Sequence, residues 1–78
     1  MDAKSFLEKH GKDKCERVAK KAGTNYAYFS QIAYGHRIPS RMLASDLVEA
    51  SEKLIPKPDE RLDVTSLLFP PEKKADAA

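Results

Sequence analysis

The chain has 78 residues, of which 41% are hydrophobic and 33% are charged, and its formal net charge is +2. One cysteine excludes an internal disulfide, and together with two histidines it is too little for a four-ligand structural zinc site. Because no apolar run approaches the ~20 residues of a membrane span, we expect one small cytoplasmic domain of packed helices, without a cofactor and without membrane contact.

The N-terminal third predicts two short helices. Residues 2–10 carry apolar side chains at helical spacing, and the following Gly11 is a residue type that commonly ends helices. From Cys15, the apolar residues of the segment 12–22 recur at i, i+3, i+4 and i+7, which is one stripe of an amphipathic helix. Gly23 is predicted to end this second helix.

The next helix is predicted over residues 26–34, after the capping residue types of Thr24 and Asn25 and before Gly35. Pro39 then interrupts any helix, and Ser40 is a good N-cap.

A longer helix is predicted over residues 41–54, and prolines follow it. Its expected inner face consists of Leu43, Leu47, Ala50 and Leu54.

The segment from Leu62 to Phe69 is too apolar for a free tail, so we expect a final helical turn on the core, capped by Asp63 or Thr65. The predicted fold is therefore all-α, a four- to five-helix domain over residues 1–71, followed by a mobile tail over residues 72–78.

Charge is distributed unevenly along this chain. Residues 1–45 contain nine Lys/Arg against four Asp/Glu, a net of +5, whereas residues 46–78 contain five against eight, a net of −3. A basic half of this kind suits a polyanionic partner. Solvated helix faces with a chance imbalance are the alternative.

The segment 15–35 meets the requirements of a helix-turn-helix, in which two short helices are joined by a tight turn. Ala19 is small enough to allow a close helix crossing, and Gly23 can adopt the positive φ that begins the turn. Phe29 and Ile32 are spaced to anchor the second helix on the core. An ordinary helical hairpin is the alternative interpretation.

The second helix of this unit has an apolar face and an opposite polar face, because successive residues are rotated by about 100°. The major groove of DNA admits one α-helix, and polar side chains of the types found on this face can hydrogen-bond to base edges there. The candidates for base contact are Asn25, Tyr26, Ala27, Tyr28, Ser30 and Gln31. For the serine and the glutamine, plain solvation is the alternative, and for the first two tyrosines it is packing against the core.

Residues 20–43 contain no Asp or Glu, which is the composition expected of a surface that faces phosphates. Basic and hydroxyl groups flank the second helix and could bond the DNA backbone. The candidates for phosphate contact are Lys12, Lys14, Tyr34, His36, Arg37 and Arg41.

The stretch "VAKKAGTNYAYFSQIAYGHRIPSRM", with the later "LDVTSLLFPPE", resembles the Cro/YdaS-type helix-turn-helix regulators of phages and prophages. The resemblance covers roughly residues 12–70 and implies a lambda-repressor/Cro-like fold, operator binding and transcriptional control. It places the six candidates for base contact at the start and on the outward face of the recognition helix. Tyr26, Ala27 and the long connection "SEKLIPKPDERLD" depart from the family's pattern.

We therefore expect a regulator, Cro-like and repressing, that inserts residues 25–34 into the major groove of an operator in double-stranded DNA. One recognition helix reads few bases, so a homodimer on a palindromic site is expected. Three segments are candidates for the contact between the two subunits: the loop "HRIPS", the helix over residues 41–54 and the segment around Phe69. An antitoxin or adaptor that binds a protein through the acidic C-terminal half is the alternative. The pattern contains no nucleophile–base pair and no phosphate-binding glycine loop, so we expect no enzyme and no small-molecule substrate.

Overall fold

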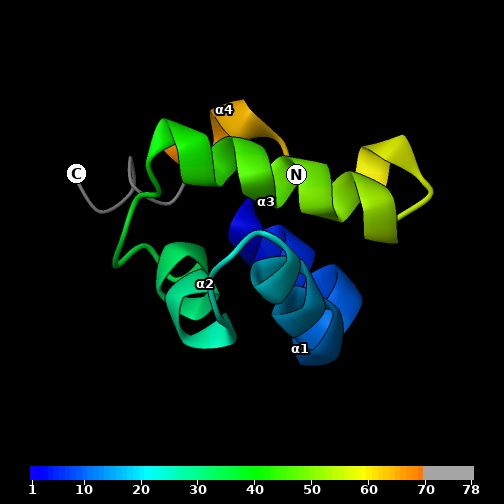
Figure 1. Ribbon diagram of the computed structural model, residues 1–78, viewed down its shortest axis with the longest axis horizontal. Coiled ribbons are helices and arrows are strands. Elements are labelled where there is room, and N and C mark those ends of the chain that lie inside the picture. Colours follow the sequence, from blue (N-terminus) through cyan, green and yellow to red (C-terminus); the bar gives the residue numbers. More distant parts are fainter. Residues whose placement is uncertain (70–78) are drawn as a thin grey trace.

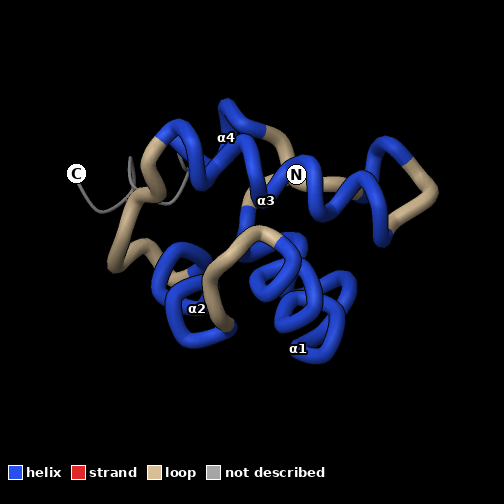
Figure 2. The backbone as a smooth tube through the Cα atoms, viewed as in Figure 1, coloured by secondary structure: helices blue, strands red, loops and turns tan. Residues whose placement is uncertain are grey.

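A computed structural model describes residues 1–69 of the chain (Figure 1). Its elements are α1 (Ala3–Lys21), α2 (Tyr26–Ala33), α3 (Arg41–Leu54), the short 3-10 helix η1 (Pro58–Glu60) and α4 (Val64–Leu68). The described residues contain helices and loops and no strand, so the predicted all-α class is confirmed (Figure 2). The tail predicted over residues 72–78 lies outside this part of the chain. Among residues 1–69, no helix combines the length and the apolar character that crossing a bilayer requires.

The two helices expected before Gly23 form one bent helix, α1. The bend is at Gly11, whose φ of 86° and ψ of 169° are not helical. The predicted interruption therefore falls at the right residue, but the helix resumes directly after it. The N-terminal end of α1 is capped by Asp2, whose side chain accepts a hydrogen bond from the backbone N–H of Ser5 at 2.8 Å.

A tight turn joins α1 to α2. Gly23 has a φ of 91°, and its N–H donates to the carbonyl of Lys20 at 3.1 Å, while the N–H of Thr24 donates to the carbonyl of Ala19 at 2.9 Å. These two bonds form a Schellman motif, which needs a residue that tolerates positive φ at its centre. The next helix is then capped by Asn25, whose side-chain oxygen accepts from the N–H of Tyr28 at 2.9 Å.

The core lies where α3 crosses the pair formed by α1 and α2, and α4 packs against α3 (Figure 1). Phe6 and Phe29 are fully buried there, with ring centroids 6.2 Å apart in an edge arrangement. The whole buried set is Ala3, Phe6, Cys15, Val18, Ala19, Phe29, Ile32, Ala33, Ala44, Leu47, Ala50, Ile55, Leu62 and Leu67.

The inner face of α3 is rotated relative to the prediction. Ala44 and Ser51 are fully buried, whereas Leu43 and Leu54 are only partly buried and pack at the margin of the core. The predicted inner face is therefore confirmed at Leu47 and Ala50, which are buried, and wrong at its two outer leucines.

Residues 60–62, where η1 ends, are hydrogen-bonded to both α1 and α3. The Ser51 hydroxyl donates to the carbonyl of Val48 at 2.7 Å and accepts from the N–H of Leu62 at 3.2 Å. The His10 Nε2 donates to the carbonyl of Glu60 at 2.8 Å. These bonds hold residues 60–62 against both α1 and α3.

The final helix, α4, is capped by Asp63, one of the two predicted caps, whose carboxylate accepts from the N–H of Ser66 at 3.0 Å. The Ser66 hydroxyl also donates to this carboxylate and thereby lowers the pKa of Asp63. The expected final helical turn on the core is confirmed, since α4 forms here and both Leu62 and Leu67 belong to the core. Leu67 is buried, but Phe69 is 73% exposed and Val64 lies at the surface, because the short helix turns only one stripe inward.

Candidate nucleic-acid interface

Helix α2 presents one apolar face to the core and one polar face to solvent. Phe29, Ile32 and Ala33 are at most 5% exposed, and they fix the orientation of the helix. On the opposite face Gln31 is exposed and Ser30 is partly exposed. The division between inward and outward residues that was predicted from the spacing is confirmed.

The remaining candidates for base contact lie around this polar face. Asn25 and Ala27 are exposed, and Asn25 also caps the helix through its side-chain oxygen. Tyr26 and Tyr28 are half-buried and pack against the core. Each of these tyrosines thus packs part of its side chain against the core and leaves the rest at the surface.

Each of these tyrosines has a cation above its ring. The Nζ of Lys12 lies 5.3 Å from the ring centroid of Tyr26, and the guanidinium carbon of Arg37 lies 5.4 Å from that of Tyr28. Both distances are within the range of cation–π attraction. The two ends of α2 therefore each carry a basic group that is held next to the polar face.

Arg37 makes a second contact on this face. Its Nε donates to the side-chain oxygen of Gln31 at 2.5 Å. This pairing of a predicted base contact with a predicted phosphate contact was not expected from the sequence. The signal that could have revealed it is Gly35, because a glycine that ends a helix by a Schellman motif turns the following residues back over the last turn.

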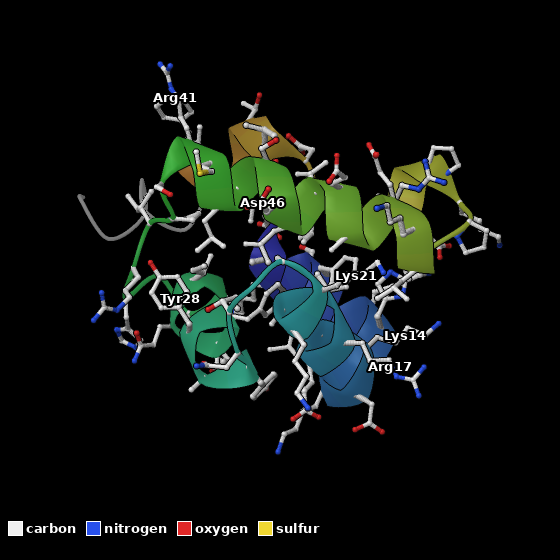
Figure 3. The ribbon with its side chains drawn as sticks, in the orientation of Figure 1. Lys14, Arg17, Lys21, Tyr28, Arg41 and Asp46 are labelled. Carbon is white, nitrogen blue, oxygen red and sulfur yellow. The ribbon has the colours of Figure 1, made fainter. Side chains whose placement is uncertain are left out.

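The other candidates for phosphate contact are distributed more widely. His36 is exposed directly after α2, and Tyr34 is 55% exposed at the end of α2. Lys14, by contrast, points outward from α1 on the side away from α2, and Arg41 extends from the first turn of α3 away from the helix pair (Figure 3). The structure therefore brings Lys12, His36 and Arg37 to α2 and leaves Lys14 and Arg41 apart from it.

Lys14 belongs to a basic stripe on α1 that the sequence reasoning did not single out. Arg17 and Lys21 follow it at i+3 and i+7, which places all three on one side of the helix, and all three are exposed (Figure 3). Helical spacing was the available signal. The stripe ends at a groove of ≈ 260 Å³ between the end of α1 and the middle of α3.

That groove carries charges of both signs. Lys21 and Lys53 line it together with Asp46 and Glu49. Within residues 1–69 no three His, Cys, Asp or Glu side chains are grouped so that they could hold a metal ion. Burial raises the pKa of the Cys15 thiol to about 12, so this cysteine stays protonated and is a poor nucleophile.

What α2 offers chemically is a set of hydrogen-bonding groups on a rigidly anchored helix, with basic groups at both ends and no carboxylate between them. Such a set can bond polar edges and anionic groups, but it holds no pair of groups for acid–base or nucleophilic chemistry. Comparison of the chain with protein-family models, with curated proteins and with solved structures finds no match.

Proposed function

We propose that this protein binds duplex DNA in a sequence-specific manner and regulates transcription as a Cro-like repressor. In this proposal α1 and α2 form the helix-turn-helix, and α2 enters the major groove with its polar face. The observation that carries the proposal is the orientation of α2, which hides Phe29 and Ile32 and exposes Gln31, Ala27 and Asn25.

Charge supports the same proposal. The exposed face of α2 lies within a stretch, residues 20–43, that has no carboxylate, so no side chain of this stretch repels a phosphate. Lys12 and His36 flank the two ends of the helix, where the two phosphate backbones that border a groove would pass.

The positions of the lysines distinguish between two predicted phosphate contacts. Lys12 lies over Tyr26 at the beginning of α2, whereas Lys14 points away from α2. We therefore assign the phosphate contact to Lys12, and we expect Lys14 to remain in solvent when α2 is in the groove.

A homodimer is part of the proposal, because one eight-residue helix reads only a few base pairs. Each of the three segments considered for the dimer contact exposes a large apolar side chain. These are Ile38 in the loop after α2 (45% exposed), Met42 in the first turn of α3 (77% exposed) and Phe69 after α4 (73% exposed). Sedimentation equilibrium of the wild type and of Met42→Lys tests this part, since loss of self-association in the variant supports a contact through α3.

The DNA-binding proposal is tested by selecting duplexes from a random pool and measuring the affinity for the enriched site by fluorescence anisotropy. Ala27→Glu places a carboxylate at the centre of the exposed face of α2. We expect it to reduce binding by more than about 100-fold, as repulsion from phosphates and loss of close contact act together. The melting temperature should stay the same or rise slightly, because an acidic residue in the first turn of a helix is favourable.

Thr65→Glu is the matched control, since Thr65 is also an exposed residue at the second position of a helix. It introduces the same charge on α4, outside the exposed face of α2. Helix α4 packs mainly on α3, and it borders α2 only at the buried Ile32 and Ala33. We expect it to leave the affinity within about twofold. Equal loss in both variants would mean that net charge alone governs binding, and no enrichment of any duplex would reject the proposal.

A further inference from the structure

Arg37 is held in a defined position against the polar face of α2. Its Nε donates to the side-chain oxygen of Gln31 at 2.5 Å. Its guanidinium carbon lies 5.4 Å from the centre of the Tyr28 ring. The guanidinium group is therefore fixed by one hydrogen bond and one aromatic ring, although the residue is in the loop that follows the helix.

The backbone explains why Arg37 returns to this face. Gly35 adopts a φ of 81°, and its N–H donates to the carbonyl of Ile32 at 3.2 Å. The N–H groups of His36 and Arg37 both donate to the carbonyl of Gln31, at 2.8 and 3.3 Å. This Schellman motif reverses the chain within two residues, so the side chain of Arg37 starts directly beside the last turn of α2.

The contacts of Arg37 leave the outer part of its guanidinium group available. An arginine has five N–H donors, and in the part of the chain that the structure describes only the Nε donor of Arg37 makes a hydrogen bond. The two terminal nitrogens form a planar fork whose spacing matches the O6 and N7 acceptors of guanine in the major groove. A phosphate contact requires only a nearby positive charge, whereas base recognition requires a fixed fork.

The same hydrogen bond changes what Gln31 can do. A glutamine that reads adenine uses its amide oxygen and its amide nitrogen together. Here the oxygen already accepts from Arg37. The geometry is therefore better suited to a glutamine that positions an arginine than to a glutamine that reads a base by itself.

We propose that Arg37 reads a guanine of the operator through its two terminal nitrogens, and that Gln31 and Tyr28 position its guanidinium group. This inference rests on the proposed DNA-binding function and deepens it. It makes Arg37 a specificity-determining residue and Gln31 a positioning residue. The chemical class recognised is a guanine edge in the major groove of duplex DNA.

The test uses the full chain and the duplex enriched from the random pool. Each guanine of that duplex is replaced in turn by 7-deazaguanine, which lacks the N7 acceptor but keeps the base pair and the phosphate charges. At one guanine of each half-site, we expect the affinity of the wild type to fall by roughly fivefold or more, the lower end of what a bidentate contact contributes. Arg37→Lys keeps the charge but lacks the fork, and we expect it to bind both duplexes equally while its affinity for random DNA is maintained.

Gln31 variants test the positioning role through the same affinity ratio. Gln31→Ala removes the acceptor and should reduce the ratio between the guanine and the 7-deazaguanine duplex towards one. Gln31→Glu retains an oxygen that can accept from Nε, so it should preserve the ratio even though its negative charge weakens binding to both duplexes.

The proposal is overturned if Arg37→Lys retains the wild-type ratio, or if no guanine of the enriched site is sensitive to loss of N7. In either case the enrichment of a specific duplex would still support the DNA-binding function, with Arg37 as a phosphate contact. Absence of binding to any duplex would instead reject the proposed function itself.

Discussion

Replacing Phe29 tests whether the buried ring holds α2 in its orientation. The ring is fully buried, and it meets Phe6 in an edge arrangement at 6.2 Å. Truncation of such a phenylalanine to alanine costs about 3–5 kcal/mol, through lost transfer energy and the cavity left behind. A 78-residue protein has about 4–12 kcal/mol of stability in total. Phe29→Ala is therefore expected to lose a large part of this stability, and at the lower end of the range it would be unfolded at 25 °C.

Phe29→Leu makes the same test in a variant that folds. It removes the edge contact between rings, which contributes about 0.5–1.5 kcal/mol, and part of the buried volume, so we expect a total loss of about 1–2 kcal/mol. Urea unfolding followed by far-UV circular dichroism measures this loss. With a slope of about 1 kcal/mol per molar urea for a small domain, the midpoint should fall by about 1–2 M.

Tyr34→Ala is the matched control, because Tyr34 is a large aromatic residue that directly follows α2 and is 55% exposed. We expect its cost to stay within about 0.5 kcal/mol. The reasoning is refuted if Phe29→Leu loses less than about 0.5 kcal/mol, or if Tyr34→Ala is equally destabilising. Either result would mean that α2 is not held by the inward face that the structure assigns to it.

Three further predictions concern other contacts. Lys12→Ala should reduce the slope of log affinity against log salt by about 1, whereas Lys14→Ala should leave the slope unchanged, and equal effects would contradict the assignment. Ser51→Ala leaves the N–H of Leu62 without its buried acceptor, so urea unfolding should show a loss of about 1–3 kcal/mol; a neutral result would mean that this bond is replaced by water. Because burial raises the pKa of Cys15 from 9.0 to about 12, its contribution to stability is complete below about pH 9. As the pH rises above about 9, this contribution to the free energy of unfolding should decrease by up to about 1.4 kcal/mol per pH unit, until the pH reaches the pKa of the folded state. Cys15→Ala should lack this part of the alkaline loss, and identical pH profiles of variant and wild type would refute it.

Helix boundaries could be predicted where they depend on neighbours in the sequence. Asn25, Ser40 and Asp63 each cap the helix that follows them by accepting a backbone N–H three residues ahead. A cap of this kind requires one side-chain oxygen and an extended backbone at that residue. A cap therefore depends only on residues that are close in the sequence, and it can be predicted from the sequence alone.

The buried face of α3 could not be predicted in the same way. The spacing identifies Leu47 and Ala50 correctly, but it also points to the partly buried Leu43 and Leu54 and misses the fully buried Ala44 and Ser51. Ser51 is buried because its hydroxyl is paired with the N–H of Leu62, eleven residues later. No local pattern reveals which small polar residue meets a partner at that distance, so a serine in a helix is normally read as solvent-facing.

For the candidate site, the sequence identified which residues share the exposed face of α2 but not how they contact each other. The face follows from helical periodicity alone. The pairing of Arg37 with Gln31 depends on how the backbone turns after Gly35, and the distance of Lys14 from α2 depends on the way the two helices pack. Both are properties of the folded chain.

Because α2 is short, its exposed polar face depends on the folding of the whole molecule. Eight residues are two turns, and an isolated helix of this length is not stable in water. The polar face therefore exists only while the core persists, and a ligand captured by that face binds the folded chain and ignores the unfolded one. Such a ligand at 100 times its dissociation constant would increase the free energy of unfolding by about 2.7 kcal/mol. Thermal denaturation in the presence of candidate duplexes would thus report occupancy without any label.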